Sequence, residues 1–152
     1  MYAAIDDSIS MVHICNPNNP TGKILDPDKL RAFCIKASKK TLVLVDEAYN
    51  EIIDDPPKHS MIPLVKAGHN VIVARTFSKI YGLAGFRVGY GFAHHDLISN
   101  LMKVKLPFEP SSLGQVAAFS ALDDKVHLQK SISSNLDGRR RYEKLFKELK
   151  IK

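Results

Sequence analysis

The chain has 152 residues, a hydrophobic content of 45% and a net charge of +6. This length and hydrophobicity suit one folded domain with a core, and no apolar run reaches the ~18 residues of a membrane span. The first residues, MYAAIDDSIS, lack the basic start and the apolar stretch of a signal peptide. Because the two cysteines, Cys15 and Cys34, match no metal or redox spacing, we expect buried thiols in a cytoplasmic protein.

The pattern of apolar runs predicts strands and helices that alternate along the chain. In chain order we expect a strand over 12–15, a helix that starts at Pro27 behind Asp26 as its N-cap, a strand over 42–45, a short helix over 62–67, strands over 71–74 and 88–92, and helices over 96–103, 113–122 and 126–150. Continuous apolar strands separated by helices predict an α/β fold with a mainly parallel sheet and helices on both faces.

The positive charge is concentrated at the C-terminal end. Residues 139–152 hold seven basic and two acidic side chains, so they carry +5 of the total +6. The apolar residues of this segment recur at i, i+3, i+4 and i+7, which predicts an amphipathic helix with a solvated basic face. A nucleic-acid binder that uses this segment would leave the polar clusters described below unexplained, and we expect neither a nucleic-acid nor a membrane partner.

Three polar clusters follow the first three predicted strands. They are NPNNPTG at 16–22, DEAY at 46–49 and RTFSK at 75–79. Taken singly, they are typical of a turn, a strand end and an exposed lysine. In a parallel sheet, however, ligands bind beyond the carboxyl ends of the strands, and three such clusters at successive strand ends indicate a binding site.

The third cluster and the residues after it suit a phosphate group. Thr76 and Ser78 offer hydroxyl groups, and Arg87 offers a guanidinium that can bind two phosphate oxygens at once. The glycines that follow would let the backbone approach a ligand closely, but they do not form the GxGxxG pattern of a dinucleotide site.

The remaining side chains suit an aromatic ring with an aldehyde. The carboxylate of Asp46 can hold a protonated ring nitrogen, and Asn19 and Tyr49 can form hydrogen bonds to a ring oxygen. The amine of Lys79 can form an imine with an aldehyde. Phosphate, ring nitrogen, ring oxygen and aldehyde are the four groups by which a protein holds pyridoxal 5′-phosphate.

The motifs NPNNPTG, VDEAYNEI and RTFSKIYGLAGFRVGYG, in this order, resemble the central part of class I/II, fold-type I aminotransferases, especially the histidinol-phosphate aminotransferases. The likeness runs from about 12 to 122. It implies transfer of an amino group between an amino-acid-like amine, with histidinol phosphate favoured, and a 2-oxo acid. It also implies a homodimer and a cis Asn19–Pro20 bond. The site residues that it implies are Lys79 as the imine-forming and proton-transferring residue, with Asn19, Asp46, Tyr49, Thr76, Ser78 and Arg87 around the cofactor.

The resemblance also implies longer chains, with more sequence before the first cluster and a smaller domain after the last helix. We therefore expect a fragment, with a partial cofactor-binding large domain over 1–125 and a long helix over 126–152 that leads toward a small domain. Alone, it is expected to be inactive in transamination.

Three alternatives remain open from the sequence. The motifs bind cofactor rather than substrate, so another aminotransferase or a phosphothreonine-type decarboxylase fits equally well. A non-catalytic remnant of the fold also fits. For His94 and His95 we predict no metal, because Asp96 is more simply an N-cap.

Overall fold

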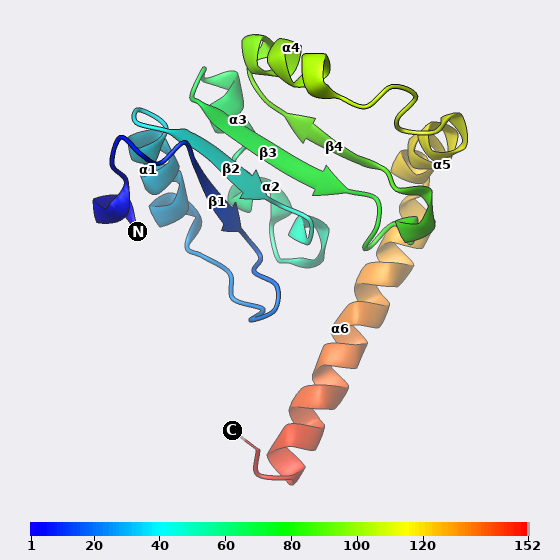
Figure 1. Cartoon of the computed structure of the whole chain (residues 1–152). Helices are drawn as coiled ribbons and strands as arrows, with labels where there is room; N and C mark the ends of the chain where they lie inside the picture. The colour runs from blue at the N-terminus through cyan, green and yellow to red at the C-terminus, as the bar shows by residue number, and fades with distance from the viewer. Residues whose placement is uncertain (152) are drawn as a thin grey trace.

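Four strands form a single sheet in the computed structural model, which describes residues 1–151 (Figure 1). Strands β1 (Met11–Cys15), β2 (Leu42–Asp46) and β3 (Val71–Thr76) are parallel neighbours and lie in sequence order. Strand β4 (Gly89–Phe92) pairs with β3 in the antiparallel direction. The four predicted strands and the mainly parallel sheet are therefore confirmed.

The longer helices lie close to the predicted ranges. Asp26 caps the first of them, and its side chain accepts hydrogen bonds from the amides of Asp28 and Lys29. For α4 (His95–Val104) the predicted N-cap was wrong, since His94 rather than Asp96 caps the helix. Four short elements had no clear pattern, namely α2 and the three 3-10 turns. The elements are η1 (Tyr2–Ala4), α1 (Pro27–Ala37), η2 (Asn50–Ile52), α2 (Pro56–His59), α3 (Ile62–Lys66), η3 (Ala84–Phe86), α4 (His95–Val104), α5 (Ser112–Asp123) and α6 (Lys125–Glu148).

Helices α1 and α3 pack on the same face of the sheet (Figure 1). Each connects two parallel strands, and right-handed connections between strands that advance in one direction lie on one face. The sequence led us to expect helices on both faces, whereas these two connections cover one. The buried core lies under them and includes Ile14, Leu30, Cys34, Val43, Val45, Leu64, Val71 and Val73. Leu44 and Ile72, which point to the opposite face, are half-buried.

The two cysteines are both free, as predicted, but only one is fully buried. Cys34 lies in the core, where burial raises the pKa of its thiol to about 11. Cys15 is half-buried at the end of β1, and its thiol donates to the Pro17 carbonyl at 3.3 Å.

The last three helices bury little of their surface. Gly114 and Ala118 of α5 are their only buried residues in the described part of the chain. A Cβ atom at Gly114 would lie 2.6 Å from Val88 Cγ2, so the glycine lets α5 contact the segment before β4. Large apolar side chains on α4, α5 and the segment between them are exposed, namely Met102, Val104, Leu106, Phe108, Leu113, Val116 and Phe119. None of the helices in residues 1–151 has both the length and the apolar character needed to cross a membrane.

Candidate functional site

Five of the seven predicted site residues line one hollow of about 380 Å³ at the carboxyl ends of β2 and β3. Parallel strands end at the same edge, and here the register sets Asp46 of β2 beside Ala74 of β3. The loop that leaves β3 adds the rest of the lining. The five residues are Asp46, Thr76, Ser78, Lys79 and Arg87.

Local hydrogen bonds fix the shape of the loop after β3. The Thr76 hydroxyl oxygen accepts from the Ser78 amide at 3.0 Å, and the Gly82 amide donates to the Lys79 carbonyl at 2.9 Å. Arg87 has a left-handed backbone, with φ 54°, and its Nη1 donates to the Ala84 carbonyl at 2.8 Å. The side chains of Lys79 and Arg87 remain exposed to solvent at the mouth of the hollow.

The two other predicted residues, Asn19 and Tyr49, contact each other. Asn19 Nδ2 donates to the Tyr49 hydroxyl at 3.2 Å, and both residues line a second hollow. Lys79 Nζ of the first hollow lies 5.5 Å from the centre of the Tyr49 ring. The Asn19–Pro20 bond is cis, as predicted.

A third hollow, of about 610 Å³, separates Tyr49 and Lys79 from helix α6. Its α6 side carries His127, Lys130 and Asn135. The position of α6 beside the site was not predicted, since its residue pattern indicates a helix but not where that helix packs. The contact of α6 with η2, next to Tyr49, brings them together.

A buried ion pair behind the hollow was not predicted. The Glu47 carboxylate is 1% exposed, and Arg75 donates to its Oε2 through Nη2 at 2.7 Å and Nε at 3.1 Å. Both residues belong to the quoted clusters, but we assigned them no role. The available signal was an acid just after the end of β2 and an arginine just before the end of the neighbouring strand β3.

Burial shifts the pKa values of the groups around this pair. For Arg75, burial lowers the pKa of the guanidinium, but the hydrogen bond and charge of Glu47 outweigh it, so that the pKa stands above its ordinary value. Burial raises the pKa of Glu51, whose carboxylate lies 3.9 Å from Arg75 Nη1. Burial also raises the pKa of Tyr90, which sits opposite Arg75 on β4. Arg75 is therefore the fixed positive charge of this cluster.

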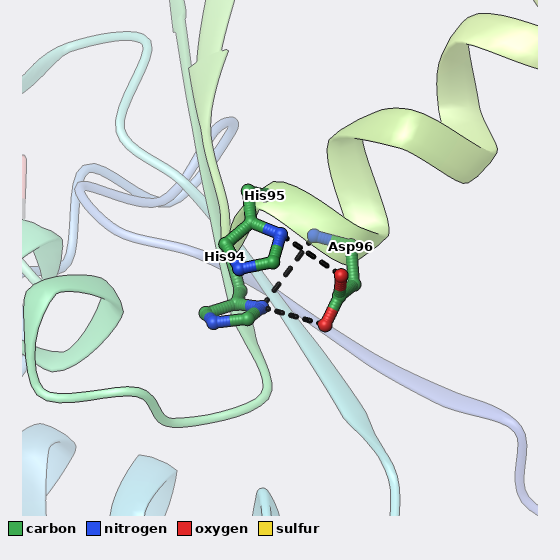
Figure 2. A group of neighbouring side chains, drawn as sticks. All are labelled: His94, His95 and Asp96. Carbon is green, nitrogen blue, oxygen red and sulfur yellow. Dashed lines mark hydrogen bonds and ion pairs between the residues drawn. The ribbon is translucent and has the colours of Figure 1, made fainter.

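The histidine pair lies away from these hollows, at the start of α4. Figure 2 shows both rings turned toward Asp96, with the Nδ1 atoms of His94 and His95 at 3.4 and 2.8 Å from its carboxylate. The three side chains are exposed, and the Asp96 amide already donates to His94 Nδ1. The positive end of the helix dipole further disfavours a cation here. The structure gives His94 a capping role, and the absence of a metal here stays a prediction.

The geometry defines an α/β protein whose sheet edge gathers a lysine, a carboxylate, two hydroxyl groups and an arginine. Residues 1–151 match the model of the family Aminotransferase class I and II, and the chain belongs to that family.

The proteins similar to this chain include named aminotransferases, one of which has a solved structure. The chain is 44% identical to a histidinol-phosphate aminotransferase of Brevibacillus brevis over 97% of this chain and 41% of the relative. It is 47% identical to an aromatic amino acid aminotransferase of Mycobacterium bovis over 81% of this chain and 35% of the relative. The structure of histidinol-phosphate aminotransferase from Sinorhizobium meliloti in complex with pyridoxal-5′-phosphate matches with a TM-score of 0.86 and 32% identity, over 93% of this chain and 38% of that one. The chain thus spans about two fifths of the length of these proteins.

Proposed function

We propose that this chain carries the cofactor-binding core of a pyridoxal 5′-phosphate-dependent aminotransferase. The amino group moves between an amino-acid-like amine, with histidinol phosphate favoured, and a 2-oxo acid. The observation that carries the proposal is the single hollow lined by Lys79, Asp46 and the phosphate-binding candidates. The family membership and the relatives named histidinol-phosphate aminotransferase support it.

The donor groups of the hollow fit this cofactor. Lys79 and Arg87 against Asp46 leave an excess of positive charge, which suits a phosphate. One Asp46 oxygen, Oδ1, accepts from the Ala48 amide, and the other oxygen is available to a protonated ring nitrogen. The Thr76 oxygen accepts from the Ser78 amide, and its O–H stays available to donate to a phosphate oxygen.

Each side chain then has a distinct task. When bound, the cofactor supplies an electron sink for the charge that develops at the substrate Cα. Asp46 keeps the ring nitrogen protonated, because a nearby negative charge favours the charged form. Lys79 would bind the cofactor aldehyde and, as a free amine, would carry the proton at the substrate Cα. Asn19 and Tyr49 orient the ring oxygen, and Thr76, Ser78 and Arg87 bind the phosphate.

The choice of amino donor has one specific competitor. The relative named aromatic amino acid aminotransferase is 47% identical over 123 residues, slightly more than the first histidinol-phosphate aminotransferase over its longer match. An aromatic amino acid is therefore the second candidate donor. A phosphothreonine-type decarboxylation and a non-catalytic remnant are weaker alternatives, because no feature of the hollow favours either.

A homodimer is part of the proposal. The exposed apolar side chains of α4, α5 and the segment between them form one candidate interface, where Phe108 is 98% exposed with a left-handed backbone. Aspartate at Phe108 should lower the dimer fraction in sedimentation velocity, whereas aspartate at the exposed Tyr142 of α6 should not. Equal dimer fractions in both variants would contradict this interface. A cytoplasmic location is proposed as well, in keeping with the two free cysteines.

Two measurements on the full-length protein test the function. Borohydride reduction of the cofactor-loaded protein should attach the cofactor to the peptide that contains Lys79, and label on Lys103 or Lys105 instead would refute the assignment. Amino transfer to 2-oxoglutarate should then be faster from histidinol phosphate than from phenylalanine. A faster reaction from phenylalanine would establish the aromatic candidate in its place.

A further inference from the structure

We infer that the buried Glu47–Arg75 pair, held by Ser60, is a positioning device that fixes the two strand ends from which Asp46 and Thr76 reach the cofactor. The inference rests on the proposed function and concerns residues that do not themselves line up with any cofactor group. It starts from the way in which Glu47 is bound.

Glu47 is held by donors from two other segments of the chain. Its Oε1 accepts from the Met61 amide at 2.6 Å, and its Oε2 accepts from the Ser60 hydroxyl at 3.0 Å and from Arg75. Arg75 Nη2 also donates to the Ser60 hydroxyl at 3.2 Å. One carboxylate therefore ties together the end of β2, the start of α3 and the end of β3.

The pair is connected to the site through the backbone. Glu47 directly follows Asp46, and Arg75 directly precedes Thr76. Successive side chains of a strand point to opposite faces, so the pair lies on the helix-covered face while Asp46 and Thr76 point to the other. The Glu47 amide donates to the Ala74 carbonyl at 2.9 Å, and the Asn16 amide donates to the Asp46 carbonyl at 3.0 Å. A rotation of Glu47 would thus move Asp46 relative to both neighbouring strands.

The energetic cost of burying the Glu47–Arg75 pair, and its location behind the site, indicate a role beyond packing. Buried ion pairs are weak contributors to stability compared with apolar residues of the same size, so stability alone is a poor reason for one here. A charged pair with a fixed hydrogen-bond pattern instead permits one arrangement of the strands. Side chains that bind a cofactor need neighbours that hold them in place, because they function only within a small range of positions.

The test uses the full-length protein, with Glu47→Gln and Arg75→Lys as the main variants. Glutamine keeps the shape of Glu47 but removes its charge, and lysine keeps the charge of Arg75 but loses the two-nitrogen contact. Ser60→Ala is a milder variant that removes one hydrogen bond to each partner and should fold if the others do not. Val43→Ala is the control, because Val43 is fully buried in β2 and its register partner is Val71 rather than a residue of the pair.

Two readouts separate positioning from plain stability. The first is the affinity for pyridoxal 5′-phosphate from absorbance titration, and the second is the pH midpoint of the absorbance of the bound cofactor. Glu47→Gln should weaken the affinity by about tenfold, a typical effect of supporting residues, and should move the midpoint. Arg75→Lys and Ser60→Ala should follow with smaller changes in the same direction. Val43→Ala should lower the melting temperature and leave the midpoint unchanged.

The outcomes distinguish the two proposals. If the unmodified protein binds no pyridoxal 5′-phosphate, the proposed function fails and this inference with it. If the unmodified protein binds it, and Ser60→Ala, with whichever of the main variants folds, matches Val43→Ala in midpoint and affinity, the pair is structural only. The proposed function would then stand without the positioning role.

Discussion

The sheet half of the chain, residues 1–92, and the helical half, residues 93–151, handle their apolar side chains in opposite ways. In the sheet half, apolar residues from three strands and from α1 and α3 form one buried cluster. In the helical half, a single cluster anchors α5 beside Phe77 and Val88, and most large apolar side chains face solvent. The candidate site belongs to the first half, since all seven of its predicted residues lie there.

This difference indicates that the sheet half and the helical half have separate roles. The residues that must hold fixed positions stand on strand ends whose backbones are paired and whose back face is packed. The exposed helices have the composition of surfaces that meet another protein surface, because isolated patches of this kind are uncommon on monomers. Under the proposed function, the sheet half would supply the precise geometry of the site, and the helical half would supply the surface for contact with a second copy.

Replacement of Lys79 should give the largest effect. In the full-length protein, Lys79→Ala should lower transamination by at least about 10³-fold, because the same amine binds the cofactor and carries a proton. Lys103→Ala, on exposed α4, is the matched control and should change the rate little. Initial rates with histidinol phosphate and 2-oxoglutarate measure both. A similar loss in the two variants would move the essential lysine out of the sheet half.

The next largest effect concerns the chain taken alone. Residues 1–152 should bind pyridoxal 5′-phosphate weakly and transaminate at least about 100-fold more slowly than the full-length protein, because no side chain here is assigned to the substrate carboxylate and small misplacements are costly. Rates at equal concentration check this. Robust turnover by the chain alone would require a carboxylate-binding residue within it, and Arg139, which lines the hollow beside Asn19, would be tested first.

A pair of identical substitutions sharpens the comparison of stability. Val71 is buried in β3, and Val116 is exposed on α5. Val71→Ala should cost about 2 kcal/mol of unfolding free energy through lost burial and a cavity, whereas Val116→Ala should stay within about 0.5 kcal/mol. Urea unfolding of the chain at low concentration, where dimers dissociate, gives both values. Equal costs would mean that α5 is covered in solution.

The sequence predicts the strands and the residues at their ends better than it predicts the packing behind those ends. The apolar runs located all four strands, and the parallel edge brought Asp46, Thr76 and Lys79 together as expected. The direction of β4 and the face covered by α1 and α3 depend on strand order, which a local pattern does not encode. The Ser60–Glu47 contact joins residues 13 apart through the packing of α3, so no motif signals it.

The smallest predicted effect tests the rear of the site through Glu51. Burial raises the pKa of this carboxyl, so between its unfolded and folded pKa values the folded state binds more protons than the unfolded state. Stability from this group is therefore present at low pH and is lost as pH rises through the folded pKa. Glu51→Gln should remove that loss, because the glutamine amide does not titrate.

The measurement compares urea unfolding of Glu51→Gln and the unmodified chain at about pH 4 and about pH 7, which span the ordinary carboxyl range and above. Glu143→Gln, on the exposed face of α6, serves as the control because its carboxylate is solvated. The stability of Glu51→Gln relative to the unmodified chain should rise from the lower pH to the higher one, and by more than that of Glu143→Gln. An unchanged difference for Glu51→Gln would mean that Arg75, 3.9 Å away, compensates the burial of Glu51 fully. Arg75 would then neutralise two ionised carboxylates, Glu47 and Glu51, and the buried region behind the site would hold three charged side chains.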